Sequence, residues 1–143
     1  MIVVDANLLI YSYNSASARH KKSAAWLRST LSGTEAVGLP WQTLLAFLRV
    51  VTNRRLSGMC PTLEQAAQIV EEWLQLPNVQ ILTAGERHWS VLRRMLVEGR
   101  ASGPLATDAD IAALTIEYGG VLYTADRDFA RFPGLRWKNP LIG

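Results

Sequence analysis

The sequence is poor in cysteine and histidine. Among its 143 residues, Cys60 is the single cysteine, and His20 and His88 are the two histidines. A lone cysteine excludes an intrachain disulfide and a zinc site built from paired cysteines, and it favours a reducing, cytoplasmic location. Two isolated histidines further disfavour zinc. We expect each histidine to lie on a solvated helix face.

Long hydrophobic runs are also missing. No charge-free stretch approaches the roughly 18 residues of a membrane helix, and residues 36–48, among the longest, contain Pro40 and Gln42. The N-terminus has no basic start and places Asp5 inside its apolar segment, which is unlike a signal peptide. We therefore expect a soluble protein with no membrane association.

Several sequence motifs for nucleotide and phosphate chemistry are absent. The chain has neither G-x-G-x-x-G nor a P-loop, which argues against a nucleotide-binding domain. A haloacid-dehalogenase phosphatase needs Asp-x-Asp after its first strand, where this chain has Asp5-Ala6-Asn7. A receiver domain needs paired early acids and a late lysine, whereas the only late lysine here is Lys138. These comparisons disfavour both alternatives.

The length and charge of the chain are more permissive. A length of 143 residues predicts a single domain spanning residues 1–143, and a domain near this size buries roughly 68–70% of its unfolded surface. The net charge is +3 and the sequence pI is about 9.4. This moderate basic excess suits a polyanionic partner.

Aspartates are few, and all of them lie in three short clusters. The five aspartates are Asp5, the pair Asp108 and Asp110, and the pair Asp126 and Asp128. Aspartate is unfavourable inside helices and strands, but it is a short oxygen ligand suited to the junction between a strand and a helix. In a basic chain these clusters indicate either helix caps or a local acidic pocket.

Apolar periodicity predicts alternating strands and helices. We expect strands over residues 2–4, 37–39, 79–82, 121–123 and 135–137, and helices over residues 8–11, 17–31, 41–53, 62–76, 86–98 and 107–118, with a helical turn over residues 126–132. Such alternation indicates an α/β sandwich in which helices flank a short, mostly parallel central sheet. Ligands bind such sheets beyond the carboxyl ends of the strands. We expect Asp5, Asp108 and Asp126 at that edge.

Each aspartate taken singly also has a structural explanation. Thr107 or Asp108 could cap a helix, Asp110 could favour the helix dipole in the first turn, and Asp126 could cap the turn that follows it. Three segments that bring carboxylates to one sheet edge are harder to explain by capping alone. Because close carboxylates repel one another unless a cation neutralises them, the clusters predict a divalent metal, with Mg²⁺ or Mn²⁺ preferred.

Three motifs support a family resemblance. The segments I-V-V-D-A-N, T-D-A-D-I-A-A-L and L-Y-T-A-D-R-D-F-A-R-F-P-G-L resemble the PIN domain, in particular the VapC toxins of bacterial toxin–antitoxin pairs, and the match spans the chain. The resemblance implies a three-layer PIN-like sandwich and a metal-dependent endoribonuclease that attacks RNA phosphodiesters with a metal-activated water. It also implies a homodimer and a cognate antitoxin, whose C-terminal segment covers the acidic groove.

The resemblance assigns roles to individual residues. Asp5, Asp108 and Asp126 match the acidic catalytic and metal-binding positions, and Asp128 is a candidate fourth ligand. Asn7 and Thr124 match positions that orient a carboxylate or a water, with simple turn hydrogen bonding as the alternative. Charge alone, without the resemblance, gives further candidates for phosphate contacts, with solvated surface charge as the alternative for each: Arg49, Arg54, Arg55, Arg93, Arg94 and Arg127.

The sequence departs from the family pattern at Ala46. PIN nucleases usually carry a glutamate near the start of the third helix, in a segment resembling E-F-L-R, and here the segment reads Ala46-Phe47-Leu48-Arg49. Three explanations remain open: a natural subfamily that uses the aspartates alone, an engineered inactive variant, or a domain that binds RNA or a partner protein without cutting. The missing acid argues against a strict two-metal site.

Overall fold

The fold of this chain is built around a short central sheet. The computed structural model describes residues 1–55 and 60–142, and these residues form five parallel strands. The strands lie in the order β3-β2-β1-β4-β5, with bounds β1 (Ile2–Val4), β2 (Val37–Pro40), β3 (Val79–Leu82), β4 (Val121–Tyr123) and β5 (Trp137–Lys138). β1 is therefore central: Val3 pairs with Gly38 on one side and with Leu122 on the other.

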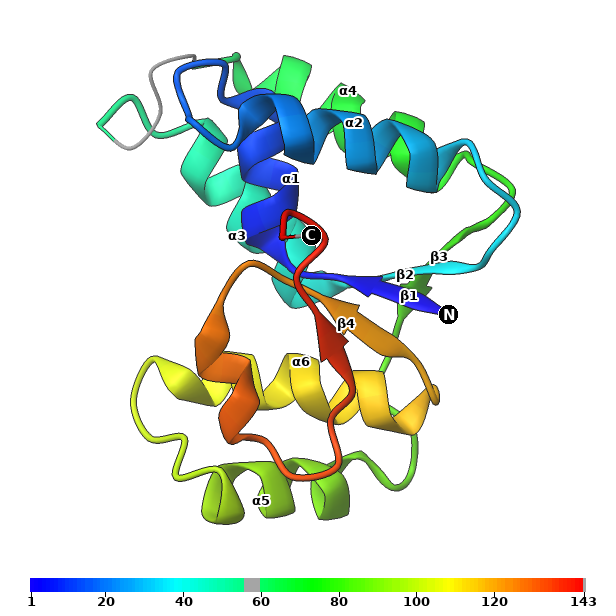
Figure 1. Cartoon of the computed structure of the whole chain (residues 1–143), viewed down its shortest axis with the longest axis vertical. Helices are drawn as coiled ribbons and strands as arrows, with labels where there is room; N and C mark the ends of the chain where they lie inside the picture. Colours follow the sequence, from blue (N-terminus) through cyan, green and yellow to red (C-terminus); the bar gives the residue numbers. More distant parts are fainter. Residues whose placement is uncertain (56–59, 143) are drawn as a thin grey trace.

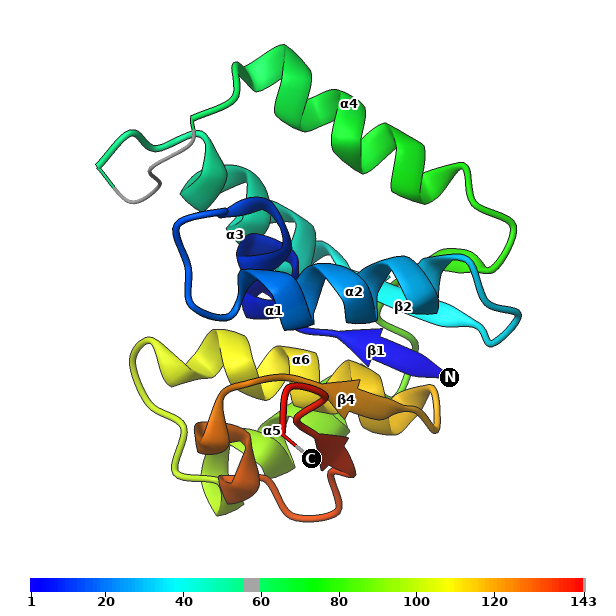
Figure 2. The same ribbon diagram turned by 45° about the horizontal axis from the view of Figure 1, so that its top comes forward.

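Helices cover both faces of this sheet. One layer contains α1 (Ala6–Tyr13), α2 (His20–Leu31), α3 (Trp41–Val51) and α4 (Leu63–Leu74), and the other contains α5 (His88–Glu98) and α6 (Leu105–Glu117). Figure 1 shows the two layers above and below the strands, and the turned view in Figure 2 shows α4 outermost. The predicted α/β three-layer sandwich is confirmed.

The two faces of the sheet have separate cores because side chains alternate along each strand. The Val4 side chain packs in the core beneath α1, α3 and α4, with Phe47 and Trp73. Its neighbour Val3 packs in the core beneath α5 and α6, with Met95. Both valines are fully buried, as expected for a parallel strand covered on both sides.

Gly38 of β2 lies where the sheet has no room for a side chain. A Cβ at this position would lie 2.8 Å from the Leu82 side chain on the neighbouring strand. Leu82 is itself buried in the core that it shares with Met95. Gly38 therefore allows Leu82 to pack across the sheet.

Most predicted elements are confirmed, with shifted ends. α1 begins at Ala6, earlier than predicted, because the Asp5 side chain caps it by accepting from the Ala6 backbone N–H. α6 begins at Leu105, directly after Pro104, so neither Thr107 nor Asp108 caps it as the sequence suggested. Proline lacks a backbone N–H, and it suits the start of a helix because N–H groups in the first turn have no acceptor within the helix.

Among the described residues, no helix is both long enough and apolar enough to span a membrane.

Candidate functional site

Asp5 lies where β1 ends and α1 begins. It is buried, with 8% of its surface exposed. Its Oδ1 accepts from the Ala6 N–H at 2.8 Å, and its Oδ2 accepts from the Thr124 hydroxyl at 2.7 Å and from the Asn7 amide at 3.1 Å. The buried carboxylate thus has donors on both oxygens, as a buried charge requires.

Thr124 connects the segments that carry the aspartates. Its side chain is fully buried just beyond β4. Its hydroxyl donates to Asp5 and accepts from the Asp126 backbone N–H at 3.0 Å and from the Asn7 amide at 3.2 Å. Asn7 in turn accepts from the Ala125 N–H at 3.3 Å. These bonds go beyond local turn bonding, because they join the two ends of the chain.

Asp126 has the capping role that the sequence suggested. Its Oδ1 accepts from the Asp128 N–H at 2.8 Å and so begins the 3-10 helix η1 (Arg127–Arg131). It also lines a cavity of about 510 Å³ together with Asp5 and Asp108. Capping and participation in the acidic cluster are therefore compatible in this residue. Asp128 is exposed and is not among the residues that line the cavity.

The cavity lies at the carboxyl edge of the sheet. Asp5 enters it from β1, Asp126 from the segment after β4, and Asp108 from the first turn of α6. The opposite wall comes from α3. The full lining is Asp5, Ala6, Asn7, Ile10, Gln42, Leu45, Ala46, Arg49, Val50, Pro104, Thr107, Asp108, Ile111 and Asp126. The fold brings together all three predicted acidic positions.

The electrostatics of the cavity are those of an acidic cluster. Burial, together with the charges of Asp5, Asp126 and Asp128, raises the pKa of Asp108 from 3.8 to about 6, while Arg131 acts in the opposite direction. Burial also raises the pKa of Asp5; the hydrogen bonds from Thr124 and Ala6 oppose this, and the charge of Asp126 adds to it. These carboxyls resist ionising together, which is the behaviour that a bound cation would reverse.

The donor chemistry of this cluster fits a hard divalent cation. Carboxylate oxygens are the ligands that Mg²⁺ and Mn²⁺ prefer, and Mg²⁺ keeps several of its waters. Within residues 1–55 and 60–142, no three Asp, Glu, His or Cys side chains already form a ready metal-binding group. Because Mg²⁺ keeps several waters when it binds carboxylates, an ion bound here would complete its shell with water or substrate oxygens.

The wall from α3 contains the position of the missing glutamate. Ala46 lines the cavity, one helical turn from Gln42 and close to Arg49. α3 is held against β1 by Thr43, whose hydroxyl donates to the Val4 carbonyl at 2.8 Å. Of the arginines proposed to contact phosphate, Arg49 lines the cavity, while the others are exposed elsewhere on the surface.

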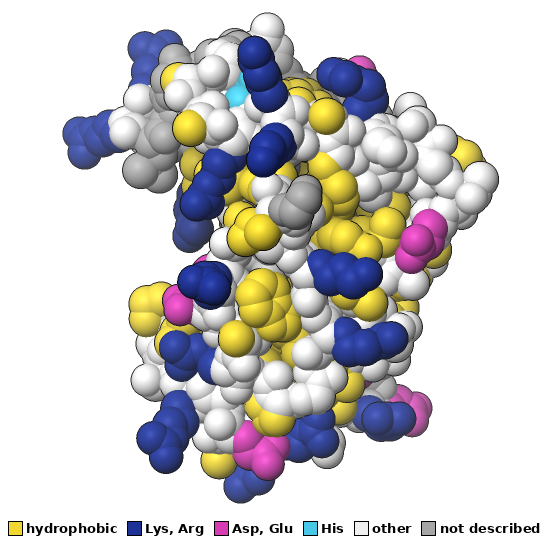
Figure 3. Space-filling view, in the orientation of Figure 1, with side chains coloured by type: hydrophobic (Ala, Val, Ile, Leu, Met, Phe, Trp, Pro, Cys, Tyr) yellow, Lys and Arg dark blue, Asp and Glu magenta, His cyan; other side chains and the backbone are white. Residues whose placement is uncertain are grey.

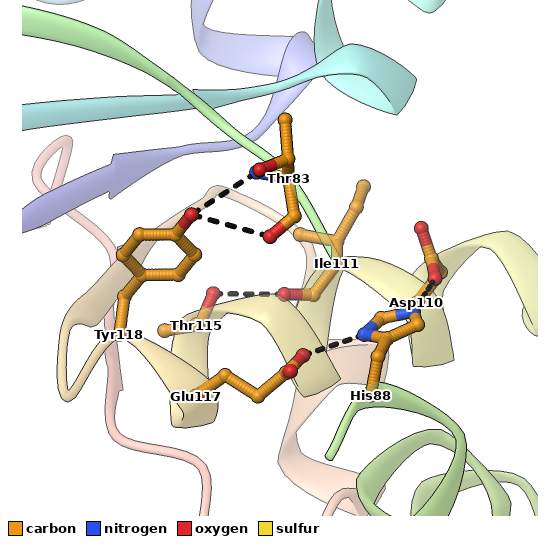
Figure 4. A network of polar contacts seen from close by, with 7 residues as sticks. All are labelled: Thr83, His88, Asp110, Ile111, Thr115, Glu117 and Tyr118. Atoms are coloured by element: carbon orange, nitrogen blue, oxygen red, sulfur yellow. Dashed lines mark hydrogen bonds and ion pairs between the residues drawn. The ribbon is translucent and has the colours of Figure 1, made fainter. Parts of the chain in front are cut away.

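His88 and Asp110 have roles that the sequence did not indicate. Asp110 is not a first-turn acid, since α6 begins five residues before it. Its Oδ1 lies 2.6 Å from Nε2 of His88, and Glu117 Oε2 lies 2.5 Å from Nδ1 of the same ring (Figure 4). The prediction of a solvated His88 was therefore wrong. These three residues are too far apart in sequence for any spacing to reveal the contact.

Comparison with known proteins gives consistent matches over the chain. The family model of the PIN domain matches residues 2–135. Ribonuclease VapC33 of Mycobacterium tuberculosis (strain ATCC 25618 / H37Rv) is 39% identical over 142 residues, which cover 99% of each chain. Ribonuclease VapC37 of the same strain is 39% identical over 140 residues, covering 98% of this chain and 97% of the relative.

Solved structures share the fold at lower identity. VapBC2 from Rickettsia felis, crystallised with a DNA fragment from its promoter, aligns with a TM-score of 0.70 and 17% identity over 97% of this chain and 98% of that chain. Mycobacterium tuberculosis VapC20, described as a sarcin–ricin loop cleaving toxin, aligns with a TM-score of 0.66 and 19% identity over 95% and 99% of the two chains.

Proposed function

This chain belongs to the PIN domain family, and on that premise we propose that it is a metal-dependent endoribonuclease acting as the toxin of a type II toxin–antitoxin pair. The observation that carries the proposal is the convergence of Asp5, Asp108 and Asp126 on one cavity. The ribonuclease names of the 39%-identical relatives support the same reaction class.

The proposal assigns a role to each group of residues in the site. Asp5, Asp108 and Asp126 would hold Mg²⁺ or Mn²⁺, with Asp128 a candidate further ligand. If bound there, the ion would supply an activated water and stabilise charge on a phosphoryl oxygen. Thr124 and Asn7 fix the orientation of the Asp5 carboxylate. Arg49, on the α3 wall, is placed to contact a substrate phosphate.

The charge of the surface supports an RNA substrate. The chain carries a net charge of +3 although the cavity is acidic. On the face in Figure 3, Lys and Arg side chains are spread over both helical layers, and acidic side chains are few. Such a surface attracts a phosphate backbone, and the metal would then offset the repulsion from the carboxylates.

A second function is favoured by one observation, the presence of Ala46 in the cavity wall. Without a carboxylate there, the site has fewer ligands for a second ion, so we expect one strongly bound metal. The alternative function is therefore a catalytically weakened PIN domain that binds RNA or a partner protein.

The proposal includes protein partners. The solved structures that share this fold include VapBC pairs from Rickettsia felis and from Haemophilus influenzae. A cognate antitoxin and a second copy of this chain would find exposed apolar side chains here, including Trp41, Leu45 and Trp89. Mass measurement after purification from cells that also express the neighbouring gene tests this part. A stable monomer with no bound protein would contradict it.

The nuclease reaction is tested with purified, partner-free protein and a structured RNA. We expect cleavage with Mn²⁺ or Mg²⁺, loss of cleavage on chelation, and loss in Asp5→Asn. Glu64→Gln makes the same acid-to-amide change at an exposed position of α4 and serves as the matched control, with unchanged cleavage expected.

Ala46→Glu separates the two candidate functions. If the natural chain does not cut RNA and Ala46→Glu does, the fold is a weakened nuclease. If neither protein cuts any of a varied set of RNAs, the nuclease proposal fails. If the natural chain already cuts, Ala46→Glu tests whether a further carboxylate raises the number of bound ions.

A further inference from the structure

His88 makes a contact that the proposed function does not use. Both nitrogens of its ring face carboxylate oxygens, those of Glu117 and Asp110, at 2.5 and 2.6 Å (Figure 4). A neutral imidazole has one N–H and can donate to one of them, whereas an imidazolium donates to both. The geometry is therefore that of a cation held between two anions.

The surroundings of His88 explain why it can stay charged. It is the first residue of α5, and 14% of its side chain is exposed. Burial and the positive end of the helix dipole both disfavour a cation there. Burial lowers the pKa of His88, but the hydrogen bonds and charges of Glu117 and Asp110 outweigh it, so the net shift is upward.

The two carboxylates belong to one face of one helix. Asp110 and Glu117 lie seven residues apart on α6, close to two full turns. One ring therefore fastens two turns of α6 to the start of α5. Tyr118, directly after α6, adds a second attachment: its hydroxyl accepts from the Thr83 N–H and donates to the Thr83 carbonyl, both at 3.2 Å.

The same helix carries a site carboxylate on another face. At about 100° per residue, Asp110 lies about 200° around α6 from Asp108. Thr107, Asp108 and Ile111 line the acidic cavity, while Asp110 and Glu117 face α5. A rotation of α6 that broke the His88 contacts would therefore also move Asp108 relative to Asp5.

We propose that His88 is a positioning residue for the metal site: by donating to Asp110 and Glu117 together, it sets the rotation of α6 and so places the Asp108 carboxylate in the cavity. The proposal rests on the function proposed above. His88 does not line the cavity and touches neither substrate nor metal in this role.

The test compares His88→Gln with the natural chain. A glutamine amide cannot donate to both carboxylates from two directions as the ring does. We expect Mn²⁺ affinity, measured by electron paramagnetic resonance, and kcat for RNA cleavage each to fall about tenfold, the lower end of what outer-shell partners of a metal site cost. KM should not change, because His88 does not line the cavity where Arg49 is placed to contact a phosphate.

Two controls keep the result specific. His20→Gln makes the same change at the start of α2, where the ring meets the Tyr11 carbonyl at 3.0 Å, and it should leave Mn²⁺ affinity and cleavage unchanged. In the natural chain, nitrogen-15 NMR of His88 should show both ring nitrogens protonated at neutral pH. A single protonated nitrogen would overturn the proposal.

The remaining outcomes are also decisive. A folded His88→Gln protein with the Mn²⁺ affinity of the natural chain refutes the proposal. If His88→Gln does not fold, Glu117→Gln keeps the Asp110 contact, and a smaller fall in Mn²⁺ affinity supports the proposal while an unchanged affinity refutes it. If neither the natural chain nor Ala46→Glu cuts RNA, the nuclease proposal fails, and Mn²⁺ affinity and the NMR spectrum still decide the role of His88.

Discussion

Replacing Thr124 with valine should destabilise the protein far more than removing one ordinary hydroxyl. The change leaves Asp5 without its 2.7 Å donor and the Asp126 N–H without its acceptor. A hydrogen bond to a charged group contributes about 1.5–3 kcal/mol, and an unsatisfied buried donor costs at least about 1 kcal/mol. We therefore expect Thr124→Val to lower the free energy of unfolding by about 3 kcal/mol.

Thr115→Val is the matched control for this substitution. Thr115 is equally buried, but its hydroxyl makes one bond, to the Ile111 carbonyl of its own helix at 2.9 Å. Its loss should cost about 1 kcal/mol or less. Thr124→Ser keeps the hydroxyl and loses one buried methyl group, which should cost about 1 kcal/mol.

Urea unfolding followed by tryptophan fluorescence measures these differences, provided that the denaturant slope does not change. Mn²⁺ binding gives a second readout. The hydrogen bond from Thr124 lowers the pKa of Asp5. Thr124→Val should therefore raise that pKa further and weaken Mn²⁺ binding. If the losses of stability in Thr124→Val and Thr115→Val differ by less than about 0.5 kcal/mol, the three hydrogen bonds of Thr124 do not stabilise the protein as argued.

Three further predictions concern charge and packing. Because the pKa of Asp108 is raised from 3.8 to about 6, its ionisation lowers the stability of the folded state, and the metal-free protein should lose stability as pH rises through this range. Asp108→Asn should remove that loss, which urea titrations at several pH values measure. Gly38→Ala should cost about 1–3 kcal/mol by forcing a Cβ against Leu82, whereas Gly85→Ala, with 3.7 Å to its nearest neighbour, should fold normally by the same urea assay. Because the pKa of His88 is raised, the stability that its two carboxylate bonds contribute should be fully present below pH 6.5 and lost as pH rises through the folded-state pKa. His88→Gln should remove this loss of stability at high pH in the same titrations.

The sequence predicted the parts of the site that depend on local order. Asp5 follows an apolar run, and the carboxyl ends of parallel strands share one edge of the sheet. This rule was enough to predict that Asp5, Asp108 and Asp126 meet, as they do in the cavity. The strands at residues 2–4, 79–82 and 121–123 were also predicted with their observed bounds.

The residues missed by the sequence depend on helix packing. His88 has partners 22 and 29 residues away, and they face it only because α5 packs against α6. The rotation of a helix against its neighbour is set by the whole interface, so no motif predicts it. Asp110 was assigned to a first turn for a related reason, since Pro104 allowed α6 to start earlier than the Thr107 cap suggested.

The bond between Asp5 and Thr124 has a consequence for the cell that makes this protein. The two residues are 119 positions apart, and at about 5–20 residues per second a ribosome needs roughly 6–24 s to add the second after the first. Until then the central strand β1 lacks its β4 neighbour, and the Asp5 carboxylate lacks the hydroxyl that orients it. A growing chain therefore has no assembled acidic cluster. Under the proposed nuclease function, the chain therefore cannot cut RNA before Thr124 and Asp126 have been added.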